Sequence, residues 1–189
     1  MNGEPRPQRW SGPIIALHWT AAAVIVALIA LGGAMIYGGL DAGRTFDLFQ
    51  LHKSLGFVAL ALTAARLIAR MASAAPPPPV SNRLERLIAA AVQGLLYVLT
   101  IAAIASGWLV VSASPLPIPT RFFNLFVIPN VAAADPALFA AATTAHKLAA
   151  WTIALLTALH VAGALKHHFG DRDDVLTRML PRAPGLPRR

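Results

Sequence analysis

The chain has 189 residues, of which 57% are hydrophobic and only 13% are charged, and its mean hydropathy is +0.61. Because soluble domains carry about 25% charged residues, this composition excludes an ordinary soluble domain and predicts a small integral membrane protein. The chain contains no cysteine, which excludes disulfides, thiolate-held iron–sulfur clusters and covalently attached c-type haem. The basic residues behind the net charge of +8 lie between apolar segments rather than in one basic arm, so they indicate membrane topology rather than binding to nucleic acid.

The first two of four apolar segments are expected to be membrane-spanning helices. Residues 14–37 are uncharged and exceed the length of about 20 residues that a bilayer requires. They are too long for a signal peptide, and Pro13 suits the first helical turn. The second segment, residues 48–70, follows a short polar connection through Arg44 and Asp47.

Two proline-rich stretches border the third apolar segment, residues 84–111. Consecutive prolines at 76–79 cannot continue a helix and predict a semi-rigid loop, after which Ser81 or Asn82 can cap the third helix. Residues 112–134 contain helix-breaking prolines and also several phenylalanines. We therefore expect an apolar loop that folds as a cap over the end of the bundle.

The fourth segment, residues 136–168, begins with an N-cap and a first-turn proline at Asp135 and Pro136. The segment that follows is a charged, proline-bearing tail, so we expect no second, soluble domain. We expect residues 1–189 to form a single all-α domain, a four-helix transmembrane bundle made of these four spans.

The lysines and arginines are distributed unevenly between the two ends of such a bundle. Twelve fall on the side of the two termini: Arg6, Arg9, Arg66, Arg70, Arg83, Arg86, Lys166, Arg172, Arg178, Arg182, Arg188 and Arg189. Four fall on the opposite side: Arg44, Lys53, Arg121 and Lys147. Because basic loops remain in the cytoplasm, we expect both termini to be cytoplasmic. The end of the bundle that carries the two termini is called the inner end below, and the opposite end the outer end.

Four histidines lie in the apolar segments at two depths. His146 and His160 are fourteen residues apart, which is about 21 Å along a helix, and they point to nearly the same face. The helix directions place His18 beside His160 at the inner level and His52 beside His146 at the outer level. An ionisable side chain inside a membrane helix is costly and indicates a functional site.

A pair of facing imidazoles at each level is typical of b-type haem. Histidine on both faces of the iron suits electron transfer rather than oxygen binding, and helix bundles build such sites from facing helices. We therefore predict two bis-histidine haem b groups, one held by His18 and His160 and one by His52 and His146, so that these four residues are the metal ligands.

Residues beside the ligands support this hypothesis more weakly. Lys53 and Lys147 each follow an outer histidine directly and are expected to pair with haem propionates. Glycines near the ligands suit the approach of a flat macrocycle or simply helix packing; they are Gly56, Gly94, Gly107 and Gly163.

Other interpretations of the histidines stay open. One histidine near a membrane-helix end is more often an interfacial hydrogen-bonding group than a ligand. Zinc is a poorer fit, because structural zinc sites need four ligands at one place. Met35, Met71 and Met179 could replace a histidine ligand, but none matches both depth and pairing.

Short motifs along nearly the whole chain carry a family resemblance. They are Leu17-His18-Trp19, Leu51-His52-Lys53-Ser54-Leu55-Gly56, Arg66-Leu67 with Arg70, His146-Lys147, Leu159-His160, and the ending His167-His168 through Asp174, Leu176 and Arg178-Met179-Leu180-Pro181. Together they resemble the prokaryotic cytochrome b561 family. The resemblance implies a four-helix cytochrome of the bacterial inner membrane with two haems, which exchanges electrons with ubiquinone, and one branch of the family oxidises superoxide.

The resemblance also implies roles for individual residues. The four histidines match the ligand positions, and His167 matches a position associated with quinone binding, although a histidine at the inner interface can equally be solvated. The proline-rich outer loop, residues 112–134, departs in sequence from the family pattern, so the outer substrate stays open.

The predicted function is that of a superoxide:ubiquinone oxidoreductase, which oxidises superoxide at the periplasmic side and reduces ubiquinone, with no catalytic side chain assigned beyond the cofactor-binding residues. One alternative is a haem-bearing membrane anchor subunit that passes electrons to or from a partner dehydrogenase or hydrogenase. Another is a transporter or scaffold without a cofactor. The sequence predicts no particular oligomeric state.

Overall fold

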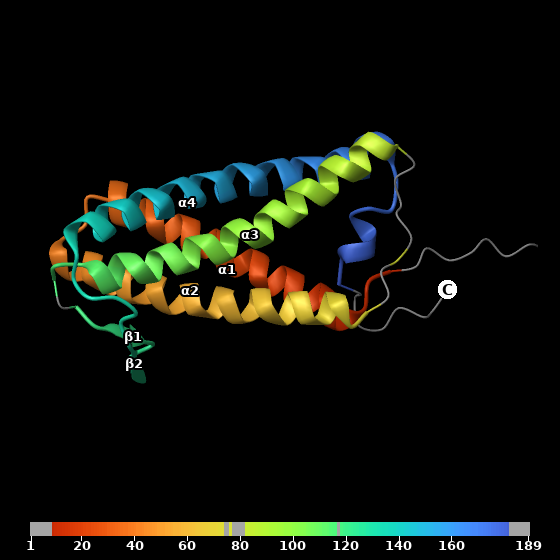
Figure 1. Ribbon diagram of the computed structural model, residues 1–189. Coiled ribbons are helices and arrows are strands. Elements are labelled where there is room, and N and C mark those ends of the chain that lie inside the picture. Colours follow the sequence, from red (N-terminus) through yellow and green to blue (C-terminus); the bar gives the residue numbers. More distant parts are fainter. Residues whose placement is uncertain (1–8, 74–75, 77–81, 117, 182–189) are drawn as a thin grey trace, which may run out of the picture.

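Four long helices form an elongated bundle in the computed structural model, which describes residues 9–73, 76, 82–116 and 118–181 (Figure 1). They are α1 (Gly12–Tyr37), α2 (Ala42–Met71), α3 (Arg83–Ala113) and α4 (Pro136–Leu165). All four are long and apolar enough to cross a membrane. The prediction of an all-α, four-helix membrane bundle is confirmed.

Capping side chains decide where three of these helices begin. Asp41 accepts a hydrogen bond from the backbone N–H of Arg44 at 3.0 Å, so α2 starts at Ala42, six residues before the apolar run. The polar connection expected through Arg44 and Asp47 is therefore wrong, because the start of a helix depends on its cap and the start of an apolar run depends on the bilayer.

The caps expected for α3 and α4 are confirmed. Asn82 accepts from Leu84 N at 2.9 Å, which identifies it as the cap of α3, whereas Ser81 lies outside the described residues. Asp135 accepts from the N–H groups of two residues in the first turn of α4, and Pro136 is the first residue of that helix. Three further features also fall outside the described part of the chain: most of the proline loop, Arg6, and the tail from Arg182 onward.

The chain changes conformation at the inner end of α4. The α-helix ends at Leu165 and continues as one π-helical turn, η1 (Lys166–Asp171), so the expected fourth span ends in a π-helix. Arg172 then adopts a left-handed conformation, with φ 56° and ψ 38°. After the short 3₁₀ helix η2 (Thr177–Met179), the chain returns across the inner end of the bundle toward α1 (Figure 1).

This returning segment is held against the start of α1 by two hydrogen bonds. The indole Nε1 of Trp19 donates to the carbonyl oxygen of Met179 at 2.6 Å. The guanidinium of Arg9 donates to the carbonyl oxygen of Leu180. The two ends of the described chain thus meet at the inner end.

The core is small and lies between α3 and α4. Ala103, Ala149 and Ile153 are buried there. Large apolar side chains elsewhere on the helices are exposed, for example Val98 at 63% and Leu155 at 61%. Such exposure is unfavourable in water but not against lipid chains, so the outer surface fits a bilayer.

A small hairpin interrupts the outer loop. The strands β1 (Thr120–Phe122) and β2 (Phe126–Ile128) pair antiparallel, with Phe122 opposite Phe126. The hairpin lies against the flank of α2 and not over the end of the bundle, so the expected cap takes a different form (Figure 1). Strands this short, flanked by Pro119 and Pro129, carry too little alternation to be recognised in a sequence.

Candidate functional site

The structure brings the four histidines together in the two pairs that the sequence predicts. At the inner level the ring centres of His18 on α1 and His160 on α4 are 6.2 Å apart, and the rings are inclined at 61°. At the outer level the ring centres of His52 on α2 and His146 on α4 are also 6.2 Å apart, inclined at 79°. Each pair therefore joins α4 to one helix of the opposite half of the bundle.

The separation within each pair fits two ligands on opposite faces of one metal. A metal–imidazole bond of about 2 Å, with the ring centre roughly 1 Å farther, places two opposed rings about 6 Å apart. Within the described residues, neither pair belongs to a cluster of three or more histidine, aspartate or glutamate side chains that could share an ion. The pairs therefore suit a planar macrocycle, which supplies the remaining ligands, and not tetrahedral zinc.

His146 is oriented by the backbone of α3. Its Nδ1 lies 2.8 Å from the carbonyl oxygen of Ala103, and because a carbonyl can only accept, Nδ1 must carry the proton. Nε2 then keeps its lone pair and is free to ligate a metal. A Cβ at Gly107 would lie only 3.1 Å from Nδ1 and Cε1 of His146, so the glycine allows the ring to approach α3.

The imidazole of His52 is held less tightly than that of His146. Its Nδ1 is buried and makes no hydrogen bond of standard geometry within the described residues. The backbone of Leu28 on α1 interacts with the ring. A Cβ at Gly32 would lie 3.9 Å from Cε1 of His52, an ordinary contact distance. The two outer rings thus have glycine neighbours that differ in how closely they approach.

Arg66 lies beside the inner pair and was not recognised as a site residue from the sequence. Its Nη2 is 3.1 Å from Nδ1 of His18, and its guanidinium lies over the ring of Tyr97, 5.1 Å from the ring centre. A guanidinium can only donate, so Nδ1 of His18 accepts in this arrangement. The available signal was depth, because Arg66 lies near the inner end of its helix, as His18 does.

The two outer lysines differ in their surroundings. Lys53 donates from Nζ to the carbonyl oxygen of Pro119 at 3.2 Å, so the outer loop holds its ammonium group. Lys147 is exposed. Their expected pairing with propionates stays a prediction, and Lys53 has donor capacity left because an ammonium group has three protons.

His167 lies in a network of charged groups at the inner end. Its side chain is only 14% exposed, which disfavours the solvated alternative. Nδ1 contacts Oδ2 of Asp173 at 2.7 Å and Oδ2 of Asp171 at 3.0 Å. Lys166 bridges Asp171 and Glu85, with both Nζ–oxygen distances at 2.8 Å.

Neither aspartate could be recognised from the sequence as a partner of His167. The π-helical turn of η1 and the left-handed Arg172 together turn the chain so that Asp171 and Asp173 reach the same nitrogen. Conformations this uncommon concentrate at functional sites, and hydropathy or helical periodicity does not reveal them.

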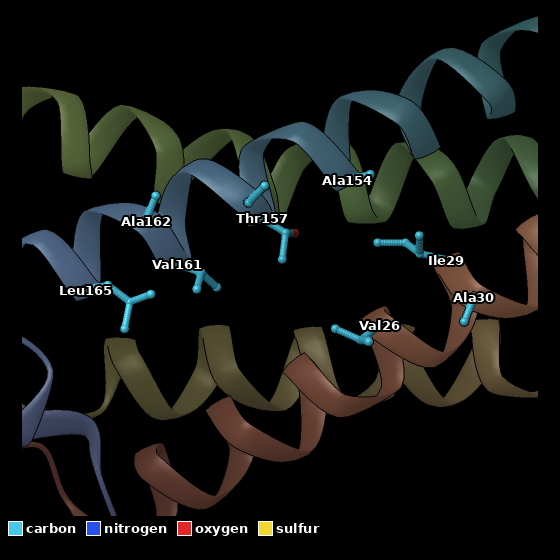
Figure 2. A pocket seen from close by; sticks show the side chains of 9 residues that line it. Val26, Ile29, Ala30, Ala154, Thr157, Val161, Ala162 and Leu165 are labelled. Atoms are coloured by element: carbon cyan, nitrogen blue, oxygen red, sulfur yellow. The ribbon is translucent and has the colours of Figure 1, made fainter.

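An apolar groove of about 580 Å³ separates α1 from α4, and none of the four paired histidines is among the nine residues that line it. Figure 2 shows Val26 and Ile29 of α1 on one side and Thr157 and Val161 of α4 on the other. Its volume lies in the range of about 300–1,000 Å³ that small-molecule and cofactor sites occupy. Since the paired histidines do not line it, the groove is a feature separate from the two histidine sites.

Comparison with known proteins agrees with this geometry. The family model described as prokaryotic cytochrome b561 matches residues 9–182, a range that contains both histidine pairs and His167. The chain is 34% identical to cytochrome b561 homolog 2 of Escherichia coli (strain K12) over 175 residues, which cover 92% of each protein. Membership of this family implies haem b. The chain therefore belongs to the prokaryotic cytochrome b561 family and is a membrane b-type cytochrome that transfers electrons.

Proposed function

We propose that the protein carries electrons through the bacterial inner membrane from an outer donor, superoxide, to ubiquinone at the inner end. The observation that carries this proposal is the presence of two histidine pairs, each with 6.2 Å between ring centres, at different depths of one bundle. His52 and His146 hold the outer haem, and His18 and His160 hold the inner one. Each haem would supply one-electron redox chemistry, and ligation by two histidines suits electron transfer rather than oxygen binding.

The residues around the ligands set the protonation of each imidazole. At the outer level the Ala103 carbonyl keeps the proton of His146 on Nδ1 and leaves Nε2 for the metal. At the inner level, ligation through Nε2 of His18 requires the same tautomer. Arg66 then has to move its guanidinium from Nδ1 to another acceptor, such as a propionate carboxylate.

His167 is the residue that we assign to ubiquinone. Asp171 and Asp173 hold the proton of His167 on Nδ1, because a carboxylate can only accept. A proton on Nε2 can then be donated to a quinone oxygen. Reduction of a quinone to a quinol takes up two electrons and two protons. Nε2–H of His167 can pass one proton at a time to the quinone and regain a proton from water on the inner side.

At the outer end, cationic side chains gather an anionic donor. Lys53 and Lys147 flank the outer histidines, and the side chain of Arg121 is exposed on the hairpin. Positive groups around a site raise the arrival rate of a small anion such as superoxide. The excess of basic residues at the other end supports a cytoplasmic location of both termini, with the outer haem facing the periplasm.

The test is a reduced-minus-oxidised visible spectrum with a haem-to-protein ratio, measured on the purified protein and on single histidine variants. Two haems per chain are expected. Replacement of His52 or His146 by alanine should remove one spectral component, and replacement of His18 or His160 should remove the other. Loss of the same component from His18→Ala and His52→Ala would show that the pairs are assigned wrongly. Stable co-purification of a soluble dehydrogenase or hydrogenase would favour the anchor-subunit alternative.

A further inference from the structure

The β1–β2 hairpin lies beside α2 at a level within the apolar part of that helix. The hairpin contacts Gln50 and Ser54, which are eight and twelve residues beyond Ala42, or about 12 and 18 Å along the helix. The apolar run of α2 starts at Leu48. Figure 1 shows the hairpin projecting sideways from the flank of α2, roughly across the long axis of the bundle. Its level is thus that of the outer membrane surface and not that of the water beyond it.

Side chains of α2 satisfy the backbone of the hairpin edge that faces them. Gln50 Oε1 accepts from the N–H of Arg121 at 3.2 Å. Ser54 Oγ accepts from the N–H of Phe123 at 3.0 Å and lies 3.1 Å from the carbonyl oxygen of Arg121. Unpaired backbone groups are costly where water is scarce, so an edge closed in this way suits a poorly hydrated setting.

The free side of the hairpin is strongly apolar. Leu125 is 77% exposed, and Phe126 and Val127 are each 57% exposed. Residues 122–134 contain no charged side chain. Exposed apolar patches of this kind on a folded protein mark a site of contact with a protein partner or a membrane.

The hairpin tip is rigid enough to present this surface. Leu125 N donates to the carbonyl oxygen of Phe122 at 2.9 Å, closing a turn in which Phe123 and Asn124 both have positive φ. Phe122 and Phe126 stack across the two strands with ring centres 5.1 Å apart. The turn and the stacked rings therefore hold the apolar side chains of the tip in exposed positions.

We propose that the hairpin is a membrane foot, a lateral element that lies in the outer interface of the bilayer with Leu125 and Phe126 against lipid acyl chains. Its apolar face continues the exposed apolar surface of the helices, which lipid also covers. The interface suits it better than the hydrocarbon centre, because water at the headgroup level can reach the second edge of a two-stranded sheet. The foot fixes the outer part of α2, which carries His52, relative to the membrane surface.

Site-directed spin labelling tests this proposal directly, because the natural chain has no cysteine. Leu125→Cys and, separately, Phe126→Cys are labelled with a nitroxide in the full-length holoprotein in vesicles of phosphatidylethanolamine and phosphatidylglycerol. Collision rates with oxygen, which concentrates in lipid, are compared with those of a water-soluble nickel chelate. Arg44→Cys, at a side chain that is 77% exposed at the polar start of α2, is the water reference. Val98→Cys, in the middle of α3, is the lipid reference.

The oxygen-to-nickel ratio at both hairpin positions should be several-fold higher than at position 44 and closer to that at position 98. A ratio equal to that at position 44 would place the hairpin in water and overturn the proposal. Access by neither reagent would mean that a protein surface, such as a second copy of the chain, covers the hairpin, and this too would overturn it. An unchanged haem spectrum shows that each labelled variant is folded.

Discussion

Nδ1 of His146 hydrogen-bonds the backbone carbonyl oxygen of Ala103 on α3, 2.8 Å away. The ring reaches this carbonyl because Gly107, one helical turn later, has no Cβ to obstruct it. The carbonyl fixes the tautomer and the glycine allows the approach, so two residues of α3 that carry no functional group orient a ligand on α4. This relationship gives α3 a role in the site even though it contains no histidine.

The first prediction concerns Gly107→Ala. The added methyl group would lie 3.1 Å from Nδ1 and Cε1 of His146, closer than ordinary contacts, so the ring must shift. Overpacking of this kind costs about 1–3 kcal/mol. We expect weaker retention of the outer haem and a changed low-spin electron paramagnetic resonance signal for that haem alone.

Gly32→Ala is the matched control, because its methyl group would meet Cε1 of His52 at 3.9 Å, an ordinary contact. It should leave both haem signals close to those of the natural protein. Equal damage from the two variants would show that helix packing in general, and not the position of His146, is responsible.

The sequence predicted the histidine pairs because their positions depend on regular geometry. A helix rises about 1.5 Å per residue, so the depths of His18 and His160 follow from the helix boundaries and directions alone. The first turn of α2 was missed because the cap at Asp41 is a local feature that lies outside the apolar run. The sequence was thus sufficient to predict those parts of the structure that depend on the regular spacing of residues along a helix.

Contacts that depend on irregular backbone or on long side chains were not predictable. Asp171 and Asp173 meet His167 through a π-helical turn and a left-handed residue, and neither has a sequence signature here. Arg66 could be placed at the inner level, but its flexible side chain has many rotamers, so its contact with His18 could not be inferred. The hairpin was missed because its strands have only three residues each.

A second prediction concerns Arg66→Gln. A guanidinium that stays near a ligating imidazole, whether on Nδ1 or on a neighbouring acceptor, would lie roughly 8 Å from the metal. At that distance a unit charge contributes about 2 kcal/mol at an effective dielectric constant of about 20. Because the positive charge favours the added electron, its loss should lower the reduction potential of the inner haem by about 90 mV. Potentiometric titration of the inner spectral component measures this shift.

Arg70→Gln is the control for Arg66→Gln, since Arg70 is one helical turn farther on and its guanidinium lies over the ring of Trp10, 5.3 Å from the centre. It should shift the inner potential much less. An inner potential that does not respond to Arg66→Gln would mean that the guanidinium moves away from the haem when the haem binds.

A third prediction concerns the network around His167. His167→Ala should slow ubiquinone reduction strongly, with little change in either haem spectrum, because the residue is not a ligand. Asp173→Asn should slow it less, since an amide oxygen still accepts the 2.7 Å bond from Nδ1 but lacks the negative charge of the carboxylate. Stopped-flow oxidation of the reduced protein by a soluble ubiquinone analogue measures both effects.

Asp174→Asn provides the comparison for Asp173→Asn, because Asp174 is adjacent in the chain but its side chain is 49% exposed and faces Arg178 at 3.8 Å. It should leave quinone reduction nearly unchanged. If His167→Ala leaves quinone kinetics unaltered, the quinone site lies elsewhere and the haem assignment stands.

The last prediction concerns capture of superoxide at the outer end, where Arg121 and Lys147 are exposed. Electrostatic attraction of an anion is screened over about 8 Å at physiological ionic strength, so superoxide-driven reduction of the outer haem should slow as salt increases. Arg121→Glu should slow it further and weaken its salt dependence, while the backbone bond from Arg121 N to Gln50 persists because it does not involve the side chain of Arg121.

Arg44→Glu is the control, because it makes the same change of charge about 12 Å along α2 from His52 and should have a smaller effect. Pulse radiolysis across a salt series measures these rates. Rates that respond to neither salt nor Arg121→Glu would exclude electrostatic capture and favour a neutral or protein donor, because a cationic surface attracts only an anion.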